Sequence, residues 1–76
     1  MIFIDLKLFV TLSKYLPENP EAFEVARGTR IEKLMEDLGI PGNSVKLIFV
    51  NGKREGRDYC LQDRDRVGLF PPVGGG

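Results

Sequence analysis

The residues with the clearest chemical potential are the last ones, Pro71-Pro72-Val73-Gly74-Gly75-Gly76. Glycine loses more backbone entropy than any other residue when it is fixed, so a terminal glycine run adds nothing to the stability of a fold. Without Cβ atoms, however, such a run can enter a narrow cleft and approach a nucleotide or a metal closely. The alternative is a frayed or engineered tail. The two prolines favour the functional interpretation, because they fix φ and would project the tail away from the domain.

Little else in the sequence could carry catalysis. There is no histidine, the commonest general base and metal ligand near neutral pH, and a single cysteine provides neither a zinc site nor an internal disulfide. Asp63 and Asp65 are close in sequence, but they lie on a predicted turn, where capping is the usual role of such carboxylates. We therefore expect no metal site and no resident cofactor.

Cys60 has two interpretations. It could be a reactive thiol that carries a persulfide, or it could be a small hydrophobic residue packed beside Leu61. Free cysteines are among the most buried residues, and the neighbours Tyr59 and Leu61 suggest packing. We therefore expect Cys60 to occupy a partly packed position.

Length and charge exclude several classes of protein. A chain of 76 residues forms one domain with one small core. Lys+Arg and Asp+Glu both number 11, and this balance argues against nucleic acid as a main partner. The basic residues Lys53, Arg54 and Arg57 are interrupted by Glu55, which indicates a solvated loop. No apolar run reaches membrane-spanning length and no signal peptide opens the chain, so we expect a cytoplasmic protein with no membrane partner.

The first half of the chain predicts two strands and a helix. One apolar face of a strand over 2–10 is formed by alternating residues, namely Ile2, Ile4, Leu6, Leu8 and Val10. Residues 11–16 suggest a short helical turn, and 22–26 suggest a second strand. Thr29 and Glu32 form a capping box at the start of a helix, and Gly39 fits its left-handed end. The buried stripe of that helix consists of Ile31, Leu34, Met35 and Leu38.

The second half predicts further strands. Residues 45–50 form an apolar strand, Asn51-Gly52 is a strong turn signal, and 53–59 has room for one short strand. A turn over 62–65 leads to a last strand over 66–70. Two strands, a helix and more strands indicate the α+β class, with a mixed sheet around one main helix.

The segment LQDRDRVGLFPPVGGG, from 61 to 76, resembles the C-terminal end of the MoaD/ThiS family, whose members are ubiquitin-like sulfur carriers. That family typically shows a Leu, an Asp-Gly-Asp turn, a short apolar strand and a final Phe-Pro-Pro-Val-x-Gly-Gly. The residues on this pattern are Leu61, Asp63, Asp65, Val67, Phe70, Pro71, Pro72, Val73, Gly75 and Gly76. Arg64 departs from it, so either the turn tolerates a side chain there or its backbone differs. Residues 47–63 also look like ubiquitin's central strand and loop. The Pro-Pro-Val end favours the molybdopterin branch over the thiamine branch.

The resemblance implies a β-grasp domain over 1–70 and a flexible tail over 71–76. It also implies that the Gly76 carboxylate is adenylated and converted to a thiocarboxylate, while Gly74 and Gly75 thread into an enzyme cleft. The chain would then be a co-substrate rather than an enzyme, and the small subunit of a molybdopterin synthase-like complex is one form of that role. The implied partners are an activating enzyme that uses ATP, a sulfur donor such as a cysteine desulfurase or rhodanese, and a larger synthase subunit.

Two alternatives share the same fold. A ubiquitin-like modifier would join its Gly76 carboxyl to a lysine through an isopeptide bond. A plain β-grasp interaction subunit would use its tail for no chemistry. The sulfur acceptor is also open, since pterin, thiazole and tRNA bases are all compatible with a carrier of this kind.

A docking surface should accompany the tail. On the last strand Val67 and Leu69 are expected to face the core, and Gly68 and Phe70 to face out. If Leu47 and Phe49 face in, then Ile48 faces out with Val50. The predicted partner-binding residues match the positions of ubiquitin's recognition patch and the start of the tail, and they are Ile48, Gly68, Phe70, Pro71, Pro72 and Val73.

Overall fold

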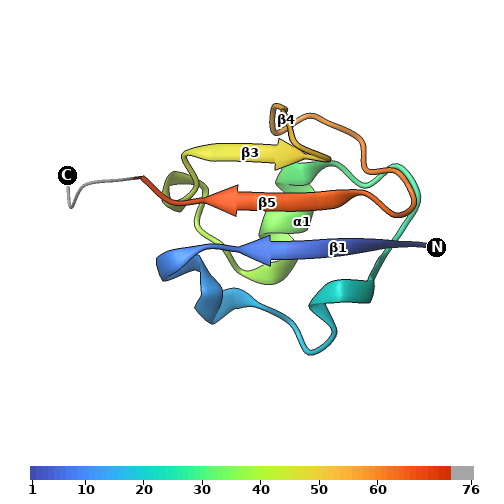
Figure 1. Cartoon of the computed structure of the whole chain (residues 1–76), viewed down its shortest axis with the longest axis horizontal. Helices are drawn as coiled ribbons and strands as arrows, with labels where there is room; N and C mark the ends of the chain where they lie inside the picture. The colour runs from blue at the N-terminus through green and yellow to red at the C-terminus, as the bar shows by residue number, and fades with distance from the viewer. Residues whose placement is uncertain (73–76) are drawn as a thin grey trace.

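In the computed structural model, which describes residues 1–72, a five-stranded mixed sheet wraps around one α-helix (Figure 1). The strands are β1 (Ile2–Leu8), β2 (Phe23–Val25), β3 (Leu47–Val50), β4 (Lys53–Arg54) and β5 (Arg66–Phe70), and the helix is α1 (Ile31–Leu38). The short 3-10 helices are η1 (Val10–Tyr15), η2 (Pro20–Ala22) and η3 (Gly42–Ser44). The sheet order is β2-β1-β5-β3-β4, with β1 and β5 parallel and the other neighbours antiparallel. The predicted β-grasp fold is therefore confirmed.

The central strand β1 follows its sequence pattern as far as Leu8. The prediction is wrong beyond that residue, because Val10, expected on the buried face, is exposed, and its positive φ of 52° turns the chain out of the strand. Ile2, Ile4, Leu6 and Leu8 are buried, and Phe3 and Lys7 are exposed on the other face. Alternate side chains of a strand point to opposite faces, so one face of β1 packs against α1 and the other stays open. Figure 1 looks onto this open face, with α1 behind the strands.

Helix α1 buries the predicted stripe but begins differently from the prediction. Gly39 closes the helix with φ 79°, as expected for a left-handed C-terminal residue. The predicted capping box is wrong, because Thr29 Oγ1 donates to the Ala26 carbonyl (2.7 Å) and accepts no hydrogen bond from an amide of the first turn. The first amides of α1 instead donate to carbonyls of the 57–59 loop, Ile31 N–H to Tyr59 (3.0 Å) and Glu32 N–H to Arg57 (2.9 Å). Backbone carbonyls from a loop distant in the sequence thus accept these hydrogen bonds in place of a local helix cap.

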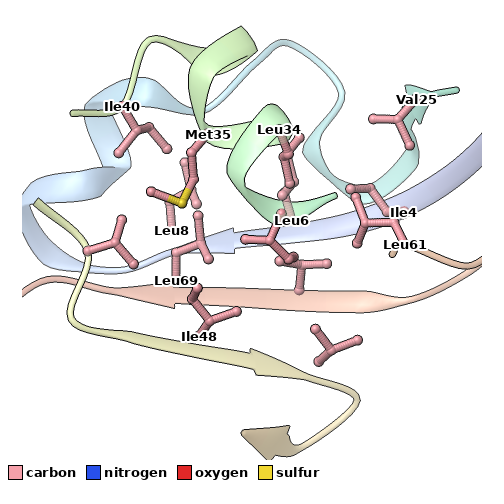
Figure 2. Packing of buried hydrophobic residues seen from close by; sticks show 14 of the residues in the cluster. Ile4, Leu6, Leu8, Val25, Leu34, Met35, Ile40, Ile48, Leu61 and Leu69 are labelled. Atoms are coloured by element: carbon pink, nitrogen blue, oxygen red, sulfur yellow. The ribbon is translucent and has the colours of Figure 1, made fainter. Parts of the chain in front are cut away.

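The predicted faces of β3 are inverted. Ile48 and Val50 are buried, with Ile48 only 5% exposed, whereas Leu47 and Phe49 are half-buried on the open face. The β3–β5 register explains the difference, since Ile48 lies opposite Leu69 and residues paired across a sheet share a face. Figure 2 shows Ile48 and Leu69 among the side chains that pack toward α1.

The turns behave as the sequence predicts. Asn51 and Gly52 both have positive φ (54° and 82°), the signature of the tight turn that joins two antiparallel strands. Arg64, where the resembling family has glycine, also adopts left-handed backbone with φ 69°. The turn therefore accommodates a side chain in the conformation that glycine favours.

Candidate functional site

The end of β5 is the place from which the glycine-rich segment starts. The backbone is held up to Phe70, because Phe9 N–H donates to the Leu69 carbonyl (3.2 Å) and Lys46 N–H donates to the Phe70 carbonyl (2.7 Å). Pro71 is half-buried and Pro72 is exposed. The predicted site residues Val73, Gly74, Gly75 and Gly76 lie outside the described residues. The segment 71–76 therefore begins at a fixed point in the centre of the sheet.

Three phenylalanines gather on the open face around this point. The ring of Phe70 stacks on that of Phe9, with centroids 4.2 Å apart and planes at 5°. Phe49 meets Phe70 edge-on, with centroids 5.6 Å apart and planes at 82°. Offset-stacked and edge-to-face arrangements of this kind stabilise aromatic pairs beyond simple burial. We refer to Phe9, Phe49 and Phe70 as the aromatic cluster.

Gly68 forms the floor of the cluster. It alternates with the buried residues Val67 and Leu69, so β5 has the predicted faces. A Cβ atom at this position would lie 3.5 Å from a ring carbon of Phe9 and 3.6 Å from one of Phe70, so a methyl group would touch both rings at ordinary van der Waals distance. The shallow hollow beside Gly68 has a volume of about 300 Å³. Its walls include Lys7 and Arg66 as well as the cluster itself.

The rim of this hollow is basic. In the sheet register, Lys7 pairs with Gly68, Gly68 with Phe49, and Phe49 with Arg54. Lys7, Arg54 and Arg66 are exposed. The ion pairs found within residues 1–72 belong to Lys33 on α1, with Glu36 and Asp37, so none involves this rim. This face thus presents three cations around partly exposed rings, together with the half-buried Asp5, which the β1–β5 register places opposite Arg66.

Val10, directly after Phe9, has an unusual conformation. Its φ is 52°, which a β-branched residue rarely adopts and which costs roughly 1–2 kcal/mol. The side chain is 76% exposed, so its burial does not offset that cost. The corner is held by Leu12, which is buried and donates its N–H to the Phe9 carbonyl (3.0 Å), and by Ser13, whose hydroxyl donates to the Val10 carbonyl (2.8 Å).

Asp65 is a structural residue at the other end of β5. It is 4% exposed, and its Oδ2 accepts hydrogen bonds from the Tyr59 hydroxyl and the Gln62 N–H, both at 2.8 Å. Its Oδ1 accepts one from Asn51 Nδ2, also at 2.8 Å. Burial, followed by the hydrogen bond to Asp65, raises the pKa of the Tyr59 phenol to about 12. The carboxylate closes the 62–65 turn, as the sequence predicts.

Asp63 has a separate structural role. Its Oδ1 accepts a hydrogen bond from Phe3 N–H (3.0 Å), and Arg64 N–H donates to the Phe3 carbonyl (2.7 Å). These contacts bind the turn to the start of β1. Asp63 and Asp65 therefore accept hydrogen bonds from different groups, and they do not form an acid–base pair.

Cys60 is exposed, so the expected packed position is wrong. Leu61 is buried and Tyr59 is half-buried, and Cys60 lies between them on the opposite side of the chain. Its backbone forms an isolated bridge with Arg30. Tyr59 and Leu61, whose apolar character suggested that Cys60 is packed, face the core themselves, and Cys60 between them faces solvent.

The basic stretch divides into two parts. Lys53 and Arg54 are exposed, as predicted for a solvated segment. Arg57 is half-buried instead, and its Nη2 donates to the carbonyls of Gly42 (2.8 Å) and Val45 (2.9 Å). Arg57 therefore fixes the connection between α1 and β3, which the alternation of charges in the sequence did not reveal.

Other kinds of site find no support in the part of the chain that the structure describes. Over residues 1–72, no three His, Cys, Asp or Glu side chains are grouped so that they could hold a metal ion. Among the helices of the same residues, none is long and apolar enough to cross a membrane.

A mixed five-stranded sheet around one helix, in which the parallel strands β1 and β5 lie side by side at the centre, defines a ubiquitin-like β-grasp protein. The sequence model of the ThiS family matches residues 6–76. The chain therefore belongs to the ThiS family, a class of small ubiquitin-like sulfur carriers.

Solved structures share the whole fold. A putative molybdopterin converting factor, subunit 1, from Pyrococcus furiosus has a TM-score of 0.72 at 26% identity, over 96% of this chain and 100% of that one. The HVO 2177 protein of Haloferax volcanii has a TM-score of 0.75 at 22% identity, over 99% of this chain and 87% of that one. Small archaeal modifier protein 1 of H. volcanii has a TM-score of 0.70 at 16% identity, over 96% and 100%. No curated protein matches the chain significantly.

The structure also reveals residues that the sequence-based site lacked. Phe9 and Phe49 complete the aromatic cluster, and Ile48 drops out of it because it is buried. Alternate residues of β1 face away from the core, as Lys7 does. Phe9 is the next residue in that series, so the alternation could have placed it on the open face. Phe49 could not be found in this way, because β3 is apolar at every position.

Proposed function

We propose that the chain is a sulfur carrier whose Gly76 carboxylate becomes a thiocarboxylate and donates sulfur for the biosynthesis of a molybdenum or tungsten pterin cofactor. The observation that carries this proposal is the ThiS family match, which extends through Gly76. The choice of a pterin rather than a thiazole is supported by the likeness to the P. furiosus molybdopterin converting factor and by the Pro-Pro-Val sequence before the glycines.

The chemistry requires activation, because a free carboxylate has no leaving group. A Gly76 carboxylate oxygen attacks the α-phosphorus of ATP and releases pyrophosphate, which gives an acyl adenylate. The terminal sulfur of a persulfide on the sulfur donor then displaces AMP and forms an acyl disulfide. A thiol reductant supplies two electrons, breaks the S–S bond and leaves the thiocarboxylate on Gly76. The carrier itself supplies no catalytic group, so it acts as a co-substrate.

The structure supports this role at the start of the tail. Phe70 is fixed by its carbonyl and by two rings, so the segment 71–76 leaves the sheet from a defined position. That segment spans roughly 20 Å when it is extended, which is enough to enter a cleft on another protein. Pro71 and Pro72 limit its bending near the sheet, and Gly74, Gly75 and Gly76 present no side chains to the cleft. The division into a domain over 1–70 and a flexible tail over 71–76 is part of the proposal.

The docking surface is the aromatic cluster with Gly68 and the adjoining Pro71, Pro72 and Val73. Ile48 is not part of this surface, because it is buried. The partners are an adenylating enzyme, a sulfur donor such as a cysteine desulfurase or rhodanese, and a larger synthase subunit, all in the cytoplasm. Partly exposed rings beside Pro71 support this assignment, because aromatic residues dominate the energetics of interfaces.

Intact mass spectrometry tests the proposal. The purified chain is incubated with ATP, the adenylating enzyme of the same organism, a persulfide donor and a thiol reductant. We expect a mass gain equal to the exchange of one oxygen for one sulfur, located on Gly76. A covalent conjugate to a lysine of another protein would establish a modifier instead, and an unchanged mass would leave only an interaction subunit.

A further inference from the structure

The end of the sheet that lies away from the tail has a surface of its own, around Phe3. The start of β1 and the end of β5 lie at opposite ends of the molecule (Figure 1). Phe3, near the start of β1, is 50% exposed. It contributes to two hollows, with volumes of about 410 Å³ and about 340 Å³. An exposed ring with a hollow on each side offers another molecule a surface of defined shape.

The side chains around Phe3 are mainly acidic. The carboxylates are those of Asp5, Glu21 and Asp63 in the larger hollow and Glu18 and Glu24 in the smaller one. Glu24 also lies opposite Phe3 in the β1–β2 register. The cations on these walls are Arg64 and Arg66, so five carboxylates face two guanidinium groups. None of these charges is paired within residues 1–72, since the ion pairs found there belong to Lys33. The surface is therefore complementary to a positively charged partner.

Asp5 indicates what kind of group would bind. It is half-buried on the open face, and its Oδ1 is buried without a hydrogen-bond partner among residues 1–72. The β1–β5 register places Arg66 opposite Asp5, yet the two form no ion pair. A buried acceptor without a donor is unfavourable, and a charged donor would remove that cost. The unpaired oxygen thus points to a cationic group that donates hydrogen bonds.

We propose that this acidic surface is a second interaction site, which takes an arginine side chain of a partner protein. The guanidinium donates to the Asp5 carboxylate, and its plane lies against the ring of Phe3. Arginine suits this combination because its guanidinium is planar, matches a carboxylate with two donors and stacks on aromatic rings, whereas the lysine ammonium is a point charge. The site is separate from the tail and from the aromatic cluster, so the inference does not rest on the proposed function.

Two other occupants fit less well. Over residues 1–72 the carboxylates are not grouped so that they could hold a metal ion. A second copy could present the cations of its own open face, such as Lys7 and Arg54. That contact would join two different patches head to tail, and contacts of this kind extend into open chains unless their rotation closes a ring.

The test is an NMR titration of the full chain, labelled with ¹⁵N, with the blocked peptide acetyl-Gly-Arg-Gly-amide. We expect saturable shifts of the backbone amides of Phe3, Asp5 and Glu24, with a Kd of about 10 mM or lower, and no shifts at Phe9 and Phe70. The same peptide with citrulline, which keeps the shape and loses the charge, should give no saturable shift. A lysine peptide should bind about threefold more weakly.

Asp5→Asn removes the charge with little change in the shape of the side chain. We expect the Kd for the arginine peptide to rise about tenfold, while the melting temperature stays equal or rises, because a buried unpaired carboxylate oxygen is lost. Asp37→Asn is the matched control, since it changes the net charge equally but lies on α1, behind the sheet in Figure 1. Its Kd should equal that of the wild-type chain. Phe3→Ala should raise the Kd about threefold or more.

Several results would overturn the inference. Equal binding of the citrulline peptide, or no saturable shift at Phe3 and Asp5, would remove the cation site, and equal or tighter binding of the lysine peptide would remove the choice of arginine. A fall in melting temperature for Asp5→Asn that Arg66→Ala reproduces, with no further fall in the double variant, would show that Arg66 satisfies Asp5 within the chain. Association of the wild-type chain that grows with concentration and is abolished by Asp5→Asn would assign the surface to a second copy. Sulfur loading of Gly76 tests the proposed function separately from all of these.

Discussion

Strand β5 begins directly after Asp65, whose buried carboxylate accepts three hydrogen bonds. It ends at Phe70, whose ring contacts the partly exposed rings of Phe9 and Phe49. The first end is closed and its polar groups are satisfied. The second end is open, apolar and flanked by the strained residue Val10. The same strand therefore has one end that stabilises the domain and another that is available for contact. Changes at the two ends should separate stability from recognition.

The largest expected effect on stability is at the closed end. Asp65→Ala removes the acceptor of three hydrogen bonds and leaves the Tyr59 hydroxyl and the Gln62 N–H without it. We expect a loss of about 3 kcal/mol in the free energy of unfolding, measured by urea denaturation. Carrier KM in the adenylation assay should stay within error of the wild-type value at a temperature where the variant is folded.

Asp63→Ala provides the control for that change. Asp63 accepts a single hydrogen bond, from Phe3 N–H, in an exposed setting. Its loss should cost about 1 kcal/mol or less. The contrast between the two ends would be broken if Asp65→Ala were as stable as the wild-type chain, or if it raised KM while Asp63→Ala did not.

The largest expected effect on recognition is at the open end. Phe70→Ala removes the ring that Phe9 and Phe49 contact, and it should weaken binding to the adenylating enzyme by about 2 kcal/mol, the scale of an interface hot spot. The stability cost should be near 1 kcal/mol, because only aromatic contacts on the open face are lost. Isothermal titration calorimetry and thermal melting measure the two quantities.

Phe3→Ala is the matched control for Phe70→Ala. Phe3 is also a phenylalanine on the open face, 50% exposed, but it lies near the start of β1, which runs parallel to β5, so it is at the opposite end of the strands from Phe70. Its replacement should leave binding unchanged. A strong fall in melting temperature for Phe70→Ala with intact binding would show that Phe70 belongs to the stabilising part of the strand.

A smaller effect is expected from pH at the closed end. The pKa of Tyr59 rises from 10.0 to about 12 on folding, so the folded state keeps the phenol proton where the unfolded state has lost it. The stability that this shift contributes is fully present below pH 10, and it declines as pH rises from 10 toward 12. Tyr59→Phe should flatten that part of the profile of unfolding free energy against pH. A profile identical to that of the wild-type chain would contradict the role of Tyr59.

The sequence predicts the fold well where its periodicity is clear. The alternation in β1 as far as Leu8, the stripe of α1 and the glycine at position 39 each specify one arrangement that the structure confirms, although Val10 lies outside the strand and Leu38 is only half-buried. Strand β3 is different, because Leu47–Val50 is apolar at every position and carries no period. Its faces are set by pairing with β5, which is a tertiary property.

The candidate site is predictable only in part for the same reason. Gly68 and Phe70 can be placed from the alternation of β5, but the aromatic cluster requires the register of three strands, β1, β5 and β3. The start of α1 shows the same limit. Thr29 has the right spacing to cap the helix, yet the carbonyls of Tyr59 and Arg57 bind those amides instead.

The central claim is that sulfur is carried on the carboxylate of Gly76, and the exposed thiol of Cys60 is its one internal competitor within the sequence. The direct test is intact-mass and fragment-mass analysis of the sulfur-loaded chain, beside Cys60→Ala and a chain extended by one alanine after Gly76. The account predicts sulfur on Gly76 in the wild-type chain and in Cys60→Ala, and none in the extended chain, with closely similar melting temperatures for all three. Sulfur on Cys60, its loss from folded Cys60→Ala, or full loading of the extended chain would contradict the account.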